Sequence, residues 1–314
     1  MGRSDTYRQP AAPDPVLPAA LVLSLAGPHL PPGRPAHRVL EVDESGGETR
    51  AYLLDGGVVV KTQRPPRLRP RTSLAKEAAL LAALARPLVG RVPELFGYDQ
   101  VETSSGRVEF IVMSALAGRA VAAWSPGRRP GPDVLRELAT VLRAVHAVDV
   151  AALRVAVPLP EDHDAVGLRR RLEPRFTDLV EALDGEPGCW PLPIPAARVA
   201  ARAVDALPPE MVQLPVVLHS NPGPTHVFTD ASGDFTGLID FGDAYASHPA
   251  LDLRSWPDPH DRIALREWYL DGGPAPAEWD AVWAVAMVYA DMAALTGGFA
   301  EAAATDLRLR LDAL

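Results

Sequence analysis

Residues 218–228 read Leu-His-Ser-Asn-Pro-Gly-Pro-Thr-His-Val-Phe, and residues 237–243 read Gly-Leu-Ile-Asp-Phe-Gly-Asp. Apolar residues at Val216–His219 predict one short strand, and those at Phe235–Asp240 predict a second. The segment Asp230–Asp234 precedes the second strand, and its Asp, Ser and Gly residues are typical of a turn. The two stretches therefore form a hairpin-like unit that is rich in His, Asn and Asp.

The polar positions in these stretches follow a spacing that kinases use. A kinase catalytic loop reads His-x-Asp-x-x-x-x-Asn, and a metal-binding Asp-Phe-Gly follows it. Here His219, Asn221 and His226 stand at the three loop positions, and Asp240 opens an Asp-Phe-Gly sequence 14 residues after His226. The spacing is kept, but Asn221 replaces the aspartate and His226 replaces the asparagine.

Upstream of this unit the sequence predicts strands around one helix. Val58–Thr62 is an apolar strand that carries Lys61 near its end, and a glycine-bearing turn precedes it. Ser73 is typical of a helix N-cap, with Glu77 in the early turns of a helix that extends to about residue 86. The other predicted strands are Arg38–Val42, Arg50–Leu54 and Arg107–Met113, with a short extended piece at Pro93–Tyr98.

After residue 118 the pattern becomes mostly helical. Pro132–His146 carries apolar residues at a period near 3.6, which indicates an amphipathic helix. This order predicts an α+β fold of the bilobal, kinase-like kind. Its strand-rich N-terminal lobe would span residues 1–115, with a Pro-rich lead-in at 1–35, and its helical C-terminal lobe residues 116–314. Other helical patterns are Leu17–Leu25, Leu168–Leu183, Ala196–Leu207 and the region from about Pro259 to the end.

With these residues in this order, the chain resembles the aminoglycoside phosphotransferase and choline kinase-like family of small-molecule kinases. That family uses His-Gly-Asp with a downstream Asn, followed by Ile-Asp-Phe or Ile-Asp-Trp. Pro249–Leu253 resembles the family's Asp-Pro-x-x-Asp-Leu segment, and Leu135–Asp149 resembles its helix that ends in Leu-His. Ile111–Ser114 resembles its hinge between lobes. The resemblance covers roughly residues 38–255 and, more loosely, the C-terminal helices.

The resemblance implies a nucleotide site between the lobes. Lys61 would hold the α- and β-phosphates of ATP or GTP, and Glu77 would fix its ammonium in an ion pair. Met113 and Ser114 would lie beside the adenine or guanine base, within Ile111–Ala115. Without this context, Lys61 would be interpreted as a solvated lysine at a strand end, and Glu77 as an ordinary helix-forming residue.

The resemblance also implies a metal site and a catalytic loop. Asp240 would be the main ligand of Mg²⁺ and His226 the second, while His219 would brace the loop rather than act as a base. The competing interpretations are a turn cap for Asp240 and a structural role for His226. Asn221 would stand at the catalytic position, so the catalytic set is Asn221, His219 and Asp240.

Two departures from the family pattern affect the chemistry. An asparagine amide has no useful basicity, although its oxygen accepts a hydrogen bond from a hydroxyl. Loss of a positioned general base typically costs about 10²–10⁴-fold in rate. The sequence leaves open whether Asn221 is natural or engineered. His226 is the milder departure, because macrolide phosphotransferases are similar in carrying histidine there and a neutral imidazole ligates divalent cations, although Mg²⁺ prefers oxygen.

Composition and charge disfavour several other classes of protein. The 314 residues carry 31 Lys and Arg and 40 Asp and Glu, a net charge of −9, which disfavours binding to nucleic acid or to an anionic membrane. The single cysteine, Cys189, excludes an intramolecular disulfide and a multi-cysteine metal site. The apolar run Leu17–Gly27 is too short to span a bilayer. We therefore expect a cytoplasmic protein.

Three weaker features have ordinary interpretations. A run of arginines before the predicted helix is expected to be a solvated surface, although it could attract an anionic substrate. Acidic residues in the C-terminal helices are expected on the surface, although the resemblance implies that this lobe could use them to bind a cationic aminoglycoside. The tryptophans there are expected in the core or a cleft wall rather than stacked on a ligand. These residues are Arg64, Arg67, Arg69 and Arg71; Asp258, Asp261, Asp271, Asp280 and Asp291; and Trp256, Trp268, Trp279 and Trp283.

The leading functional hypothesis is a phosphotransferase that moves the γ-phosphate of a Mg-nucleotide to a hydroxyl of a small molecule, such as an antibiotic or another natural product. The alternative is a catalytically impaired pseudokinase that binds nucleotide as a sensor or scaffold. A binding module without a nucleotide site would leave Lys61, Glu77 and Asp240 unexplained. The sequence names neither the acceptor, nor the choice between ATP and GTP, nor the oligomeric state.

Overall fold

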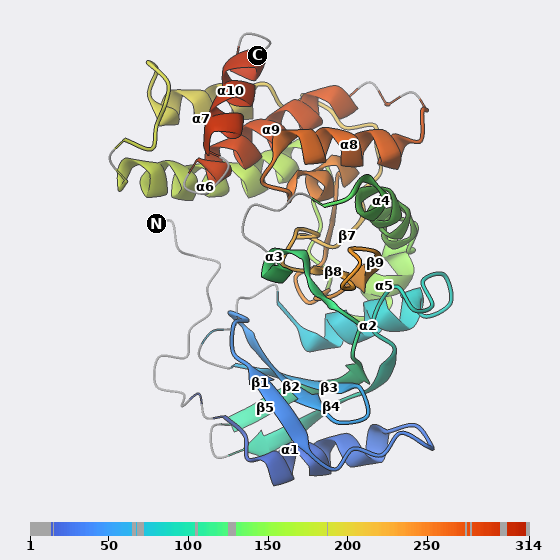
Figure 1. Cartoon of the computed structure of the whole chain (residues 1–314). Helices are drawn as coiled ribbons and strands as arrows, with labels where there is room; N and C mark the ends of the chain where they lie inside the picture. Colours follow the sequence, from blue (N-terminus) through green and yellow to red (C-terminus); the bar gives the residue numbers. More distant parts are fainter. Residues whose placement is uncertain are drawn as a thin grey trace.

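The computed structural model describes residues 14, 16–64, 67, 72–103, 106–124, 130–186, 188–273, 275–276, 278–295 and 300–311. A five-stranded antiparallel sheet forms the N-terminal part, and a mostly helical region follows it (Figure 1). This is the α+β, kinase-like architecture that the sequence predicts. The strands pair in the order β1-β2-β3-β5-β4. They span Val39–Asp43 (β1), Thr49–Leu54 (β2), Val58–Gln63 (β3), Leu95–Thr103 (β4) and Gly106–Ser114 (β5).

The turn between β2 and β3 sets the register of this sheet. Gly56 and Gly57 have φ of 77° and 68°, a left-handed backbone that glycine adopts without a steric penalty. Leu54 then pairs with Val58 across the turn, and Ala51 pairs with Lys61. Because side chains alternate along a strand, Lys61 lies on the opposite face of the sheet from Val58 and Val60.

The two faces of the sheet pack against different helices. Val58 and Val60 lie on the face that packs against α1 (Ala19–Ala26), the helix predicted inside the Pro-rich lead-in. Ile111 lies on the other face, in a core cluster that includes α2 (Leu74–Leu84) and continues into the helical region. Figure 1 shows the sheet between α1 and α2. Lys61 therefore faces the helical region.

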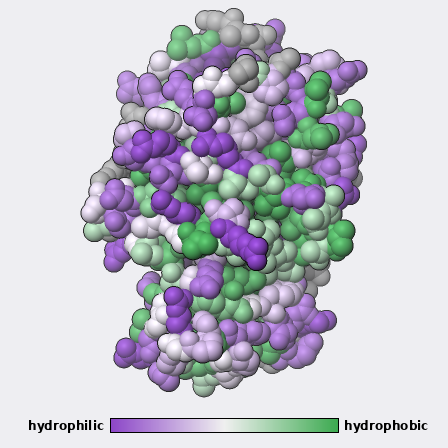
Figure 2. Space-filling view, turned by 90° about the vertical axis from the view of Figure 1, so that its right-hand side faces the viewer, coloured by the Kyte–Doolittle hydropathy of each residue, from purple (hydrophilic) through white to green (hydrophobic). Residues whose placement is uncertain are grey.

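The helical region surrounds the loops that carry the predicted site. Its central helix, α9, is apolar on nearly all sides and is buried against its neighbours. Figure 2 shows the outline narrowing between the lower part, which holds the sheet, and the larger upper part. The α-helices are α3 (Val121–Trp124), α4 (Pro132–His146), α5 (Val150–Ala156), α6 (Ala165–Asp184), α7 (Ala196–Asp205), α8 (Pro259–Leu270), α9 (Trp279–Ala294) and α10 (Ala300–Leu311).

Short strands and 3-10 turns complete the fold. The turns are η1 (Gly27–His29) and η3 (Pro249–Arg254). Two small sheets carry the loops of the hairpin-like unit, with strand orders β10-β7 and β6-β8-β9. Their strands are β6 (Arg119–Ala120), β7 (Val216–Leu218), β8 (Val227–Thr229), β9 (Phe235–Leu238) and β10 (Tyr245–Ser247). Within the described part of the chain, no helix is long and apolar enough to cross a membrane.

The structure corrects the interpretation of the arginine run. Arg64 is only 5 % exposed. Its Nη2 lies 2.6 Å from the Asp14 carboxylate, and its Nη1 donates to the carbonyls of Glu44 and Gly46. Arg64 is therefore a buried residue, and its hydrogen bonds link the end of β3 to the turn between β1 and β2. Arg67 is exposed as expected, whereas the predictions for Arg69 and Arg71 concern positions outside the described residues.

The expectation of surface acids and a tryptophan core is also only partly right. Asp258, Asp261 and Asp291 are buried, since Asp258 caps α8 and Asp291 pairs with the buried Arg262. Asp271 and Asp280 are exposed. Trp268 is 39 % exposed, so it is not a core residue, whereas the other three tryptophans are buried: Trp256, Trp279 and Trp283.

Candidate active site

A charged triad joins the sheet to the helical region. The Lys61 ammonium lies 2.7 Å from the Glu77 carboxylate on α2 and 2.5 Å from Asp240, which follows β9. The predicted ion pair between Lys61 and Glu77 is therefore present, and Asp240 is its third member. Burial opposes the charge on the ammonium, but the two carboxylates outweigh burial and raise the pKa of Lys61. The lysine stays charged.

The backbone of the Asp-Phe-Gly turn is held in an unusual conformation. Asp240 has a φ of 72°, in the left-handed region that non-glycine residues rarely adopt. This conformation persists because the surrounding contacts fix it. Gly242 accepts a hydrogen bond from the Ser73 N–H, with a donor–acceptor distance of 3.2 Å, and Asp243 accepts from the Thr72 hydroxyl. The start of α2 thus anchors the turn and directs the Asp240 carboxylate.

His226 lies on the other side of this carboxylate. Its Nε2 is 3.2 Å from Asp240 Oδ2, and its Nδ1 is 2.7 Å from the Asn221 backbone carbonyl. A carbonyl only accepts hydrogen bonds, so Nδ1 carries the proton and Nε2 faces Asp240. Burial would lower the pKa of His226, but the hydrogen bond to Asp240 raises it. For Asp240, burial would raise the pKa, but Lys61 and His226 hold it well below the usual range.

This donor set fits a nucleotide-bound Mg²⁺ ion. Within the described part of the chain, no group of three or more His, Cys, Asp or Glu could hold a metal alone. Magnesium, however, is usually bound by one or two protein ligands, with substrate phosphates and water completing its coordination. Asp240 would supply a carboxylate oxygen. His226 would supply Nε2 once the proton it shares with Asp240 has left, while its Nδ1–H bond to the Asn221 carbonyl keeps the ring in place.

His219 is a bracing residue, as predicted. It is buried, its Nε2 lies 2.8 Å from the Ile239 carbonyl, and its ring lies edge-on to Phe241 at 4.8 Å. Both contacts are to the Asp-Phe-Gly segment. Its Nδ1 accepts from the Asn221 N–H. Burial lowers the pKa of His219 to about 4, so the ring is neutral near pH 7 and both nitrogens serve the loop.

Asp252 anchors the same loop, and the sequence did not reveal this role. This buried carboxylate accepts hydrogen bonds from the backbone N–H groups of His219 and Ser220, at 2.7 and 2.8 Å. It also lies 3.1 Å from His146 Nε2, at the end of α4. A charged residue inside the apolar run Pro249–Leu253 is the signal that could have identified it, because buried charges need partners.

Asn221 is presented at the tip of this anchored loop. Its side chain is exposed, and Ser220 before it has a φ of 89°. The loop is packed against the segment behind it, since a Cβ on Gly223 would lie 2.6 Å from the Ser255 carbonyl. Asn221 and Ser220 line a cavity of about 660 Å³, which α6, η3 and α9 also line. Asn221 therefore lines a space large enough for a small molecule.

The predicted hinge residues are engaged with the protein's own backbone. Met113 is buried at the end of β5. The Ser114 N–H donates to the Glu94 carbonyl at 2.9 Å, and the Ala115 N–H donates to the Gly57 carbonyl at 2.8 Å. These two donors are used within the fold. Contact of Met113 and Ser114 with a nucleotide base remains a prediction.

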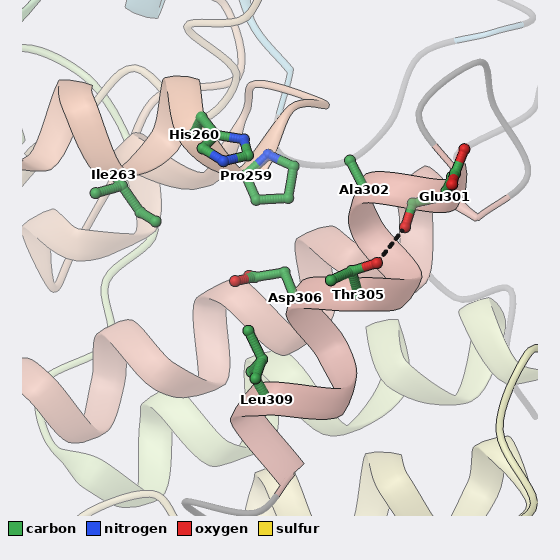
Figure 3. Close-up of a pocket in the computed structure, with 8 residues that line it drawn as sticks. All are labelled: Pro259, His260, Ile263, Glu301, Ala302, Thr305, Asp306 and Leu309. Atoms are coloured by element: carbon green, nitrogen blue, oxygen red, sulfur yellow. Dashed lines mark hydrogen bonds between the residues drawn. The ribbon is translucent and has the colours of Figure 1, made fainter.

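A second cavity, of about 510 Å³, lies between α8 and α10 (Figure 3). Pro259, His260 and Ile263 line one side of it, and Glu301, Thr305 and Leu309 line the other. The Thr305 hydroxyl donates to the Glu301 carbonyl within α10. None of the predicted site residues lines this cavity, and we assign it no role.

A sheet that carries a lysine–glutamate pair, joined to a helical region that carries an Asp-Phe-Gly turn, defines a kinase-like phosphotransferase fold. Residues 39–295 match the model of the phosphotransferase enzyme family, APH, and the chain belongs to that family. A search among curated proteins found no match for the chain.

Solved structures with this fold include the macrolide 2'-phosphotransferase MphH from Brachybacterium faecium. It shares 22 % identity with a TM-score of 0.54, covering 94 % of this chain and 95 % of its own. The GDP and kanamycin complex of APH(2")-IIia shares 16 % identity, covering 93 % and 95 %, with a TM-score of 0.58. The streptomycin and ATP complex of APH(2")-IIa shares 14 %, covering 93 % and 97 %, with a TM-score of 0.56. These likenesses show the fold.

Proposed function

We propose that this protein transfers the γ-phosphoryl group of Mg-ATP or Mg-GTP to a hydroxyl of a small molecule, such as an antibiotic or another natural product. The observation that carries the proposal is the convergence of Lys61, Asp240 and His226 on one side of the loop whose tip, Asn221, faces the cavity. Membership in the phosphotransferase family supports it. Two of the similar structures hold a nucleotide together with an antibiotic, which supports the substrate class.

In this proposal the nucleotide lies between an N-terminal lobe, residues 1–115, and a C-terminal lobe, residues 116–314. Lys61 contacts the α- and β-phosphates while Glu77 holds its ammonium. Asp240 and His226 hold Mg²⁺, which supplies charge neutralisation on the phosphate oxygens. Met113 and Ser114 lie beside the base. We place the reaction in the cytoplasm, where ATP and GTP are available.

The transfer itself needs positioning more than covalent help from the protein. The acceptor oxygen forms a bond to the γ-phosphorus as the bond to the bridging oxygen breaks, and the nucleoside diphosphate leaves with the negative charge. The Asn221 amide oxygen accepts a hydrogen bond from the attacking hydroxyl and orients it. Because the amide is not a base, the hydroxyl proton passes to an oxygen of the transferred phosphoryl group.

Asn221 also favours a second candidate function. A chain that keeps Lys61, Glu77 and Asp240 but has an amide at position 221 would bind Mg-nucleotide without efficient transfer. Such a pseudokinase would act as a nucleotide sensor or scaffold. The two candidates agree on the nucleotide site and differ only in turnover.

Two measurements on the full chain test the proposal. Calorimetry measures the binding of ATP and GTP with and without Mg²⁺, and a transfer assay with [γ-³²P]-nucleotide measures phosphorylation across a panel of hydroxylated antibiotics. Transfer to any acceptor, absent in Asp240→Asn, supports the phosphotransferase. Binding without transfer across the panel supports the pseudokinase. Failure to bind either nucleotide refutes both candidates.

A further inference from the structure

Arg254, at the end of η3, is a buried cation without a counter-ion. Only 7 % of the residue is exposed, and its Nη1 is fully buried without a hydrogen bond. Within the described part of the chain it forms no ion pair; its guanidinium lies 4.8 Å from the Tyr289 ring centroid. A buried charge is costly unless it is paired, and a ring contact satisfies none of the five N–H donors of arginine.

The acidic residues near Arg254 either bind other groups or are exposed to solvent. Asp252, two residues earlier, binds the backbone of His219 and Ser220. Asp243 lines the same cavity and accepts from the Thr72 hydroxyl. The third acid, Asp178, is exposed on α6. Among the described residues, none of these carboxylates forms an ion pair with the buried guanidinium, although the charge of Asp252 raises the pKa of Arg254 from a distance.

A second arginine faces the same space. Arg175, on α6, lines the cavity with Arg254 and is half-buried. Its positive charge acts on Arg254, where burial and then this neighbour lower the pKa of the guanidinium, although Tyr245 opposes them. Within the described residues no carboxylate forms an ion pair with Arg175. Two guanidinium groups that line one cavity are stabilised by an anion placed between them.

The remaining walls of the cavity are largely apolar. Trp256 and Pro257 follow η3, and α9 contributes small side chains at Ala290, Ala293 and Ala294. The small residues leave room beside Arg254. The cavity thus combines an apolar wall, a buried cationic end and the polar residue Asn221.

We propose that the acceptor is a hydroxylated carboxylic acid with an apolar body, whose carboxylate pairs with Arg254 and Arg175 while its hydroxyl lies at Asn221. This inference rests on the proposed function and names its substrate class. The Arg254 guanidinium has one face on Tyr289, and of its nitrogens Nη1 alone is sealed from solvent without a partner among the described residues. The edge made by Nε and Nη2 is therefore the one left for a planar carboxylate, which accepts two parallel N–H bonds. A polycation lacks the anion that this end of the cavity requires.

Three probes of one shape test the charge preference: 4-(hydroxymethyl)benzoate, 4-(hydroxymethyl)benzamide and 4-(hydroxymethyl)benzylamine. Saturation-transfer NMR measures their binding to the full chain without requiring phosphoryl transfer. We expect the carboxylate to bind at least about tenfold more tightly than the amide, the usual strength of a hydrogen bond to a charged group. The amine should bind most weakly.

Variants of the two arginines test whether these side chains cause the preference for the carboxylate. Arg254→Gln should abolish the preference for the carboxylate, and Arg175→Gln should reduce it severalfold. Arg175 is half-buried on a helix surface, so its variant keeps the test valid if Arg254→Gln does not fold. Arg169→Gln, on the same helix but outside the cavity, is the matched control and should keep the full preference.

Several results would overturn this assignment. They are equal or tighter binding of the amide or amine, no carboxylate binding at millimolar concentration, and a preference that survives in both arginine variants. Weakened Mg-nucleotide binding in Arg254→Gln would also overturn it, because the guanidinium would then serve the phosphates. The proposed function fails separately, through loss of nucleotide binding in the parent chain, whatever the probes show.

Discussion

The Lys61 ammonium and the Asp240 carboxylate lie 2.5 Å apart, although 179 positions separate the two residues in the chain. This contact connects β3 of the sheet to the turn after β9 in the helical region. Glu77 holds the other side of the ammonium. The proposed nucleotide site is therefore arranged around one buried lysine, and changes to the partners of this lysine have distinct consequences.

Replacement of Asp240 by alanine should remove the dependence of nucleotide binding on Mg²⁺. The change deletes the carboxylate that lies 3.2 Å from His226 Nε2, and Mg²⁺ relies on oxygen ligands. We expect Mg-nucleotide affinity to fall at least about tenfold, as the loss of a charge-assisted contact would produce. Calorimetry with and without Mg²⁺ measures the effect, and Asp234→Ala, which removes an exposed carboxylate just before β9, is the control. Unchanged binding of Mg-nucleotide by Asp240→Ala would show that the metal assignment is wrong.

Replacement of Lys61 by methionine should destabilise the fold as well as weaken nucleotide binding. The variant leaves the Glu77 carboxylate buried without its cation, and a broken buried ion pair costs about 3–5 kcal/mol. The double variant Lys61→Met, Glu77→Gln should recover most of the free energy of unfolding but none of the nucleotide affinity. Urea denaturation and calorimetry measure the two quantities. Full stability of the single variant would contradict the pairing.

Replacement of Asn221 by aspartate should accelerate transfer. A carboxylate accepts the proton that the amide cannot take, and a positioned general base contributes about 10²–10⁴-fold. Acceptor affinity should change much less, because one hydrogen bond replaces another. Single-turnover transfer by Asn221→Asp and by the parent chain measures the ratio, with Asn221→Ala as the control for loss of the hydrogen bond. Equal transfer rates in the parent chain and both variants would show that the side chain at position 221 takes no part in the reaction.

Acidification should destabilise the protein through His248. This buried histidine accepts the Ala250 N–H on Nδ1, and burial lowers its pKa to about 4. The unfolded chain binds a proton near pH 6.5, so the contribution is complete above that pH and disappears as pH falls towards 4. The pKa difference corresponds to about 3 kcal/mol.

The measurement is the free energy of unfolding from urea titrations between pH 7.5 and 4.5. His248→Gln should have a shallower pH dependence than the parent chain. His260→Gln is the control, because the His260 side chain is 74 % exposed. Parallel curves for the parent and His248→Gln would assign the acid sensitivity to other groups.

The sequence predicted the architecture where patterns are long or turns are distinctive. Pro132–His146 matched α4 at both ends because its apolar period runs through four turns. The turn at Asp55 predicted the β2–β3 hairpin. The strands β6, β8 and β10 have two or three residues each and were missed, since an alternation needs more positions to be visible. Helix α5 was missed as well, because its seven residues are too few to show a helical period.

The sequence predicted residues that the structure brings together, but it did not predict the contacts that hold them in place. Spacing identified Lys61 and Asp240 because kinase motifs fix distances along the chain. The burial of Arg64 depends on Asp14, 50 positions away, and no local pattern carries that information. The anchoring role of Asp252 likewise arises only when η3 meets the loop. Long-range pairing of charges is a tertiary property, and a single sequence records it weakly.

The loop that carries Asn221 is held by the Asp252 carboxylate, by the close approach of Gly223 to Ser255, and by two histidines that contact the Asn221 backbone. None of these contacts involves the side chain at position 221. An amide and a carboxylate are therefore interchangeable there as far as folding is concerned. The codons for asparagine and aspartate differ by a single base, so one point mutation in the gene exchanges them. A lineage with this loop can lose its chemistry and regain it without ever rebuilding the scaffold.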